Sequence, residues 1–176
     1  MTLFIFLVLN VAFLGISVGF LIFLIYTLII ATNKGSPYAP TKGASMETVF
    51  EFADARPGNL LVDLGSGDGA VLIAAAERGI HARGVEINPF WVWCSRFRIR
   101  RRGLEHLATV VRGDMFTHPL SDADAVFLFL VPSAMARFSP ILRRDARPGT
   151  RIITNRFPLP GWTPQKERGM ILLYHA

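Results

Sequence analysis

Residues 60–79, LLVDLGSGDGAVLIAAAERG, join a short apolar run containing one acid to three alternate glycines and an alanine-rich stretch. The apolar run predicts a buried strand at 60–64, and the alanines predict a helix at 70–78. Gly65, Gly67 and Gly69 form the turn between them, where a backbone without Cβ atoms can approach a ligand closely. In a doubly wound sheet, ligands bind at the carboxyl ends of the strands. The stretch therefore predicts a ligand-binding α/β domain.

Strands and helices alternate on both sides of this stretch. Further helices are expected at 46–55, 88–102 and 133–146, and further strands at 81–86, 107–112, 125–131, 150–155 and 168–175. Asn88 can cap the helix at 88–102, and Pro89, which follows it, suits the first helical position. The alternation indicates a Rossmann-like α/β fold with a doubly wound, mostly parallel sheet.

The first 33 residues carry no charged side chain. Leu3 to Ala31 is apolar except for Asn10, Ser17 and Thr27, and it is long enough to cross a bilayer as one helix. A cleaved signal peptide would have a basic start and a small-residue cleavage site, and neither is evident. We expect a transmembrane anchor at 1–33, a linker or active-site loop at 34–45 and one enzyme domain at 46–176. Lys34 and Lys42 follow the span, so the positive-inside rule places that domain on the cytoplasmic side.

The rest of the composition excludes some classes of site. The net charge of +6 comes from 19 basic and 13 acidic residues, and attraction to an anionic membrane explains it as well as nucleic acid does. A single cysteine, Cys94, excludes an internal disulfide and a cysteine-based zinc site. The four histidines lack the spacing of metal ligands, so we expect no metal.

Acidic side chains accompany the glycine turn. Asp63 precedes it and Asp68 lies inside it, so two carboxylates would repel the pyrophosphate of a dinucleotide. The glycine spacing G-x-G-x-G also differs from the dinucleotide fingerprint. Both features suit a ligand whose nearest part is cationic, such as S-adenosylmethionine with its ammonium and sulfonium groups.

Two more acids end the following strands. Glu86 lies 23 residues after Asp63, where a carboxylate can accept both ribose hydroxyls of a nucleoside. Asp114 follows the third strand and could meet the adenine amino group, with Met115 or Phe116 against the ring. Any one of these acids alone could be a solvated loop carboxylate, whereas acids at three successive strand ends indicate a binding site.

Four stretches together carry a resemblance to a known family: PYAPT (37–41), VDLGSGDG (62–69), GVEINPFWVWCSR (84–96) and RFPLPGWTP (156–164). The set resembles the small membrane-anchored lysine methyltransferases that include the ATP synthase c-subunit and adenine nucleotide translocase enzymes. The glycine stretch alone is shared by class I methyltransferases in general, and the other three are more specific. The resemblance runs from about Ser36 to the C-terminus.

The resemblance implies a class I methyltransferase fold, S-adenosylmethionine as cofactor and a lysine of a membrane-associated protein as acceptor. Tyr38 and Thr41 of the PYAPT loop would cover the active site. The expected cofactor site, from the resemblance and the strand-end acids together, comprises Asp63, Gly65, Ser66, Gly67, Gly69, Glu86, Asn88, Asp114 and Met115.

A lysine acceptor must be neutral, and because its free pKa is about 10.4 it needs a desolvated pocket. An aromatic wall could hold the amine. Candidates for this wall are Phe129, Val131, Pro132, Phe157 and Trp162, with Arg156 near an acid. Ordinary core packing is the alternative explanation for Phe129 and Phe157.

Three other functions remain open. A lipid or quinone methyltransferase would need the same anchor and glycine turn, and a non-catalytic S-adenosylmethionine sensor would bind the cofactor without turnover. A nucleic-acid methyltransferase is less favoured, because FLVPS (129–133) stands where an Asn/Asp-Pro-Pro-aromatic motif would follow the fourth strand. The arginines at 96–102 do not favour it either, because Arg100, Arg101 and Arg102 lie about 20 Å from the cofactor end of their helix.

Overall fold

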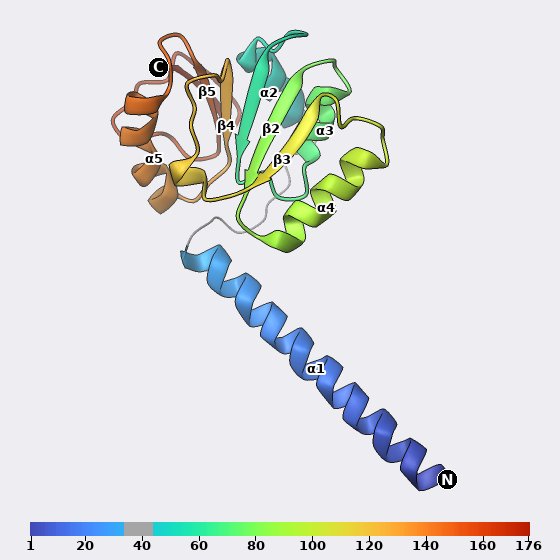
Figure 1. Cartoon of the computed structure of the whole chain (residues 1–176). Coiled ribbons are helices and arrows are strands. Elements are labelled where there is room, and N and C mark those ends of the chain that lie inside the picture. Colours follow the sequence, from blue (N-terminus) through green and yellow to red (C-terminus); the bar gives the residue numbers. More distant parts are fainter. Residues whose placement is uncertain (34–43) are drawn as a thin grey trace.

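The computed structural model describes residues 1–33 and 44–176, and Figure 1 shows a long helix leading into an α/β domain. The helices are α1 (Thr2–Asn33), α2 (Ala44–Ala53), α3 (Ala70–Ala76), α4 (Pro89–Arg100), the short 3-10 helix η1 (Met115–Thr117) and α5 (Pro132–Asp145). The strands are β1 (Leu60–Leu64), β2 (His81–Glu86), β3 (Ala108–Arg112), β4 (Ala125–Leu128), β5 (Arg151–Asn155), β6 (Lys166–Arg168) and β7 (Ile171–His175).

The strands form one sheet in the order β3-β2-β1-β4-β5-β7-β6. The pairs among β1 to β5 are parallel, and β7 is antiparallel to both β5 and β6. The order reverses direction beside β1, because β2 lies on one side of it and β4 on the other. The carboxyl end of β1 is therefore the switch point at which ligands bind in such sheets.

The expected α/β alternation is confirmed, and two predicted strands were wrong in part. The strand predicted at 168–175 is a hairpin, because Gly169, with φ of 60°, and Met170 make a tight turn between β6 and β7. The strand predicted at 125–131 ends at Leu128, since the chain must leave the sheet before Pro132 begins α5.

Each face of the sheet carries its own core. On one face, α2, α3 and α4 pack through residues such as Val49, Leu72 and Ile99. On the other face, α5 packs through Met135, Phe138 and Leu142. Figure 1 shows α5 on the opposite side of the sheet from α3 and α4. Burial on both faces explains why β1 and β4 are almost continuously apolar.

Helix α1 extends away from the domain (Figure 1). Its segment Phe4–Tyr26 has a mean hydropathy of 2.6, and none of it is buried inside the protein. By length and composition it is able to cross a membrane. Asn10 and Ser17 satisfy their polar groups within the helix, because Asn10 Nδ2 donates to the Phe6 carbonyl and Ser17 Oγ to the Phe13 carbonyl.

Replacing Phe138 with alanine tests how α5 is held. Phe138 is fully buried and stacks on Phe116, with ring centroids 4.7 Å apart. The change should lower the free energy of unfolding by roughly 3–5 kcal/mol, because it leaves a cavity. Denaturant titration of the detergent-solubilised chain measures the loss. Arg144→Ala is the matched control on the exposed side of α5, where solvent screens a surface ion pair and its loss should barely change stability.

Candidate cofactor and substrate site

The carboxyl edge of the sheet brings the predicted residues into one row. The strand register pairs Leu64 with both Val85 and Leu128, and Leu128 with Thr154. One residue further along each strand, Gly65, Glu86, Phe129 and Asn155 therefore lie side by side across the switch point. Neighbouring strands are about 4.8 Å apart, so the row places Glu86 on one side of the glycine loop and Asn155 on the other.

The glycine loop requires glycine at its last position. Gly65, Gly67 and Gly69 have φ of 84°, 52° and 76°, a backbone conformation that residues other than glycine rarely adopt. A Cβ on Gly69 would also overlap the Ser95 hydroxyl and approach the Ser95 Cβ to 3.1 Å. Helix α4 thus packs directly on the start of α3, and the loop is fixed between two helices and the sheet.

Glu86 ties the glycine loop to the turn that follows β2. Its Oε2 accepts the Gly67 N–H at 3.0 Å, and its Oε1 accepts the Asn88 N–H at 2.8 Å. The carboxylate is buried, and this burial raises its pKa above the ordinary value although the backbone donors oppose the rise. A carboxylate offers about four acceptor positions. Glu86 therefore keeps capacity for ribose hydroxyls while it holds the loop.

Asp63 is the most perturbed acid of the site. Its carboxyl is buried, and desolvation, followed by the charges of Glu86 and Asp68, raises its pKa to about 8. Side chains alternate along a strand, so Asp63 lies on the same face of the sheet as Leu61 and Glu86 on the same face as Ala82, both in the α2–α4 core. A buried carboxyl that resists ionisation would gain from a nearby cation. This property fits the ammonium or sulfonium end of S-adenosylmethionine.

Asp68 has a role that the sequence interpretation missed. It forms an ion pair with Arg98 of α4, and Arg98 Nη1 also donates to the Asp68 carbonyl oxygen at 2.8 Å. Asp68 was expected to help repel a pyrophosphate, but Arg98 compensates its charge. One member of the arginine run at 96–102 therefore anchors the glycine loop. The alternating arginines 96, 98 and 100 were visible in the sequence, but their spacing did not indicate which acid Arg98 would pair with.

Three other predicted residues shape the turns beside the loop. Asn88 caps α4 as predicted, because its Oδ1 accepts the Phe90 N–H at 3.0 Å. Asp114 caps η1 in the same way through the Phe116 N–H at 3.0 Å, so one of its oxygens is already engaged. Met115 is buried, and its Sδ lies 3.9 Å from where a Cβ on Gly65 would stand.

Ser66 is buried, and its Oγ has no hydrogen-bond partner among the residues that the structure describes. A Cβ on Gly84 of β2 would lie 2.5 Å from this Oγ. The Ser66 hydroxyl thus lies between the glycine loop and β2.

The β5 side of the row contains a residue that the sequence interpretation did not single out. Asn155 is 4% exposed, and its Oδ1 has no hydrogen-bond partner within the described part of the chain. It lies on the same face of the sheet as Ile153, and Phe129 packs against the same core. Buried polar atoms normally have partners, so an unpaired acceptor at a ligand-binding edge indicates a binding role.

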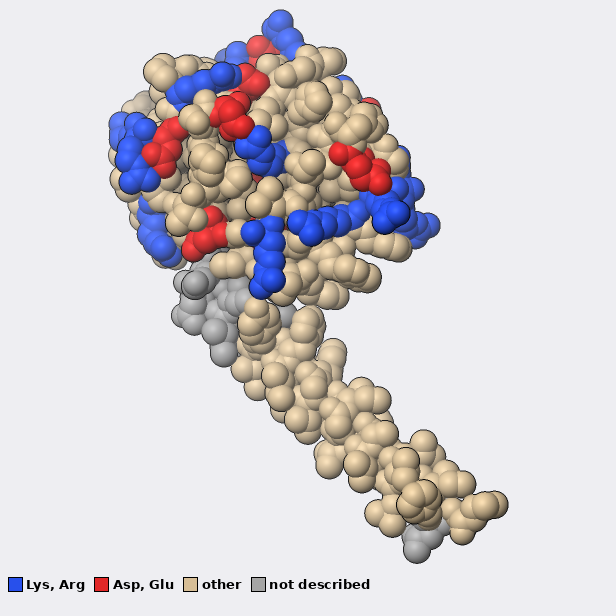
Figure 2. Space-filling model, in the orientation of Figure 1, with Lys and Arg blue, Asp and Glu red and all other residues tan. Residues whose placement is uncertain are grey.

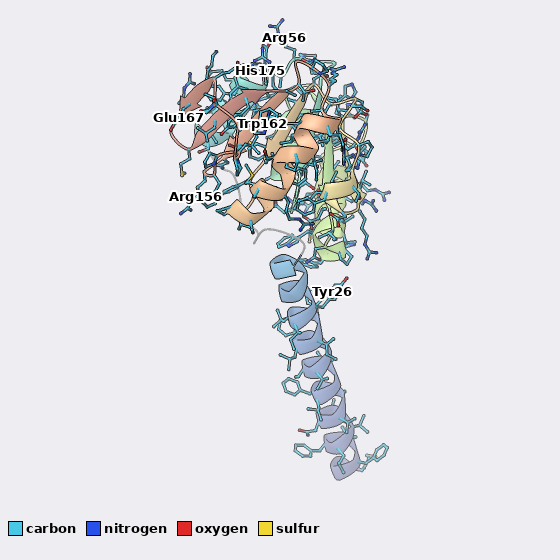
Figure 3. All side chains as sticks on the ribbon, turned by 90° about the vertical axis from the view of Figure 1, so that its left-hand side faces the viewer. Tyr26, Arg56, Arg156, Trp162, Glu167 and His175 are labelled. Carbon is cyan, nitrogen blue, oxygen red and sulfur yellow. The ribbon has the colours of Figure 1, made fainter. Side chains whose placement is uncertain are left out.

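Of the four remaining substrate-pocket candidates, two lie within the described residues and two do not. Tyr38 and Thr41 lie outside the described residues. Pro132 is exposed at the first turn of α5. Arg156 is exposed at the carboxyl edge and has a positive φ of 74°, a strained conformation that is enriched at functional sites. Figure 3 shows Arg156 nearer to α1 than Trp162 or His175.

Trp162 is not brought together with the glycine loop. Its Nε1 donates to Ser139 Oγ at 3.0 Å, and its ring packs edge-on against Tyr174 with centroids 6.3 Å apart. Tyr174 pairs with Ile152 near the amino end of β5, and Trp162 lines a hollow there together with His175. Phe157 likewise packs against the α5 core. Both aromatics thus stabilise the loop that follows β5.

Within the described ranges, 1–33 and 44–176, no group of three or more His, Cys, Asp or Glu side chains is arranged to hold a metal ion. The described residues combine a glycine loop after β1 with a buried Asp63 before it. Glu86, an acid placed to bind ribose hydroxyls, ends β2, and the seven-stranded sheet has one antiparallel strand, β7. These define a class I methyltransferase.

Comparison with known proteins identifies the family. The family model described as ANTKMT methyltransferase domain matches residues 63–166, and the chain belongs to that family. The solved RNA methyltransferase from Salinibacter ruber, in complex with S-adenosyl-L-homocysteine, superposes with a TM-score of 0.75 at 30% identity. That match covers 78% of this chain and 93% of the other. S-adenosylmethionine is thus the cofactor of this fold, in agreement with the sequence prediction.

Two curated relatives show how far the similarity extends. The chain is 38% identical to the human lysine N-methyltransferase of the ATP synthase c-subunit over 76% of its own length and 57% of the relative. It is 32% identical to a protein-lysine N-methyltransferase of Saccharolobus islandicus over 74% of its own length and 82% of the relative. The chain spans little more than half the length of the human relative.

Replacing Gly69 with alanine tests the close approach of α4. We expect a loss of roughly 2–5 kcal/mol in unfolding free energy, because a positive φ and an overlapping Cβ both cost energy. Gly103→Ala is the matched control, since Gly103 has φ of 65° but nothing lies near its Cβ position. That variant should lose only about 1–2 kcal/mol. Equal losses in urea titrations of the two variants would contradict the overlap.

The raised pKa of Asp63 predicts how stability varies with pH. The unfolded carboxyl ionises near its ordinary pKa of 3.8, whereas the folded one ionises at about 8. Stability from Asp63 is therefore fully present below the unfolded pKa and is lost as pH rises through the folded pKa. Unfolding free energies of the cofactor-free chain should fall over this window, and Asp63→Asn should remove much of that fall. Parallel pH profiles for the two proteins would contradict the assignment.

Proposed function

We propose that this protein is an S-adenosylmethionine-dependent protein-lysine N-methyltransferase that acts on a membrane-associated protein. The observation that carries the proposal is the 38% identity with the human ATP synthase c-subunit lysine N-methyltransferase, which extends over 76% of this chain. The archaeal protein-lysine N-methyltransferase supports it, because the match covers 82% of that relative.

The cofactor would be held along the carboxyl edge. Asp63 would face the cationic end of the cofactor, and the glycine loop would surround its methionine part. Glu86 would bind the ribose hydroxyls, and Asp114 and Met115 would hold the adenine. When bound, S-adenosylmethionine supplies a methyl group to a neutral amine. Support comes from the acids and glycines that the register brings together at the switch point.

The acceptor lysine would enter on the β5 side of the row. Asn155 Oδ1 would accept an N–H of the neutral amine and aim the nitrogen lone pair at the methyl group. Phe129 would exclude water, which keeps the amine unprotonated. Alignment and water exclusion are the main requirements of such a displacement. The burial of Asn155 and its unpaired oxygen support this assignment.

We further propose that α1 crosses the membrane once and that the domain lies on the cytoplasmic side. The uncharged segment Phe4–Tyr26 and the lysines that follow α1 support this orientation. The division into an anchor at 1–33, a loop at 34–45 and a domain at 46–176 remains a prediction.

One observation favours a second candidate function. The superposed Salinibacter ruber protein is named an RNA methyltransferase. The segment after β4 argues against RNA as the substrate. It consists of Phe129, Leu130, Val131 and Pro132, and it contains neither the polar residue nor the proline pair that base-modifying enzymes have there. Methylation of a lipid or quinone, or cofactor sensing without turnover, are the remaining alternatives.

The decisive experiment uses the purified full chain, methyl-labelled S-adenosylmethionine and membranes from source cells that lack the gene. Label should appear in a protein band, on lysine after hydrolysis. It should be lost with Asp63→Ala and kept with Asp122→Ala, a control acid at an exposed ion pair. Label in the lipid or nucleic-acid fraction, or none despite cofactor binding, would contradict lysine methylation.

Asn155→Ala tests the substrate side separately. Losing one hydrogen bond to the amine should lower kcat on the order of tenfold to a hundredfold. The Kd for the cofactor should stay within about twofold, because the β5 side is not assigned to the cofactor. A parallel loss of cofactor affinity would show that Asn155 supports the cofactor instead.

A further inference from the structure

Helix α4 exposes an aromatic stripe made of Phe90, Trp93 and Phe97, with exposed fractions of 40%, 62% and 50%. The spacing i, i+3, i+7 places all three on one face of the helix, away from the buried Val92 and Ile99. The rings of Trp93 and Phe97 stack with centroids 5.8 Å apart. Contiguous apolar surface of this kind marks an interaction site.

The aromatic stripe is continuous with the apolar surface of α1. The Phe23 ring packs edge-on against the Phe90 ring, with centroids 5.6 Å apart. Phe23 lies 20 residues after Leu3, where the apolar run that ends at Ala31 begins, or about 30 Å along the helix axis, which is about the thickness of the hydrocarbon core of a bilayer. If that segment spans a bilayer, Phe90 lies at the level of the bilayer surface. Figure 1 shows the first turn of α4 near the end of α1 that leads into the domain.

Arginines lie at the other end of the aromatic stripe. Arg100 and Arg101 are exposed, and the Arg101 guanidinium stands 5.8 Å from the Phe97 ring centroid. Figure 2 shows Lys and Arg side chains beside an uncharged surface at the end of the domain nearest α1. Aromatic rings with neighbouring arginines match the chemistry of the headgroup region of an anionic leaflet.

We propose that the aromatic stripe of α4 docks into the headgroup region of an anionic bilayer and holds the carboxyl edge of the sheet against the membrane. The inference rests on the proposed insertion of α1. An anionic lipid surface is the occupant because the stripe continues from α1 and ends in cations. Since the N-cap of α4, Asn88, donates its N–H to Glu86, docking also fixes the distance of the proposed cofactor site from the bilayer.

Spin labels on the full chain test the docking. With Cys94→Ser as background, a nitroxide is attached at Phe97→Cys or, as the matched control, at Arg56→Cys. Arg56 is exposed at the end of the domain farthest from α1 (Figure 3). The chain is reconstituted in vesicles of phosphatidylcholine and phosphatidylglycerol. Oxygen should relax the label at 97 more than a water-soluble nickel complex does, and the label at 56 should show the reverse.

Three outcomes would overturn the proposal, and each is distinct. Docking is excluded if the nickel complex relaxes the label at 97 as strongly as it relaxes the label at 56. Dipolar broadening between labels at 97 identifies a second copy of the chain as the occupant. Release of the chain by alkaline carbonate shows that α1 does not span, and this outcome removes the membrane part of the proposed function as well.

A second variant separates lipid charge from simple burial. Arg100→Gln combined with Arg101→Gln should raise the nickel accessibility of the label at 97 in the anionic vesicles. In vesicles of phosphatidylcholine alone the two proteins should behave alike, because no surface charge attracts the arginines. An identical effect in both kinds of vesicle would contradict attraction to an anionic surface.

Discussion

The carboxylate of Glu86 is the constraint on which the site depends. Its two oxygens accept the N–H groups of Gly67 and Asn88, so one side chain joins the loop after β1 to the turn after β2. Without it, two buried donors would lose their acceptor, and each such loss costs about 1–3 kcal/mol. The same carboxylate adjoins both the glycines of positive φ and the residue that caps α4. The glycine loop is therefore held in place by hydrogen bonds within the chain itself.

Local patterns in the sequence predicted the parts of the fold that local chemistry determines. The glycine turn, the Asn88-Pro89 helix start and the strand at 81–86 needed only short stretches of chain, and the structure has all three. The sheet order depends on pairings between distant segments, which no short window of sequence contains, whereas the β6–β7 hairpin is local. Gly169 was the local signal for that hairpin, but an apolar run after it favoured a single strand.

The site divides in the same way. Asp63 and Glu86 stand at fixed positions relative to the glycines, so spacing was enough to select them. The Arg98–Asp68 ion pair joins residues 30 positions apart, and it appears only when α4 packs on the loop. Trp162 illustrates the opposite case. The sequence made it a candidate for the aromatic wall of the substrate pocket, whereas the antiparallel β7 brings Tyr174 to it at the amino end of the sheet.

The burial of Asp63 also bears on product release. In the proposed site, Asp63 would face one positive charge fewer once the methyl group has left, because the sulfonium becomes a neutral thioether. A carboxyl with a pKa of about 8 can respond by taking up a proton near neutral pH. Asp63 would then not remain as an uncompensated buried anion when the thioether product leaves. Turnover would thus be linked to proton uptake at the departure of the product.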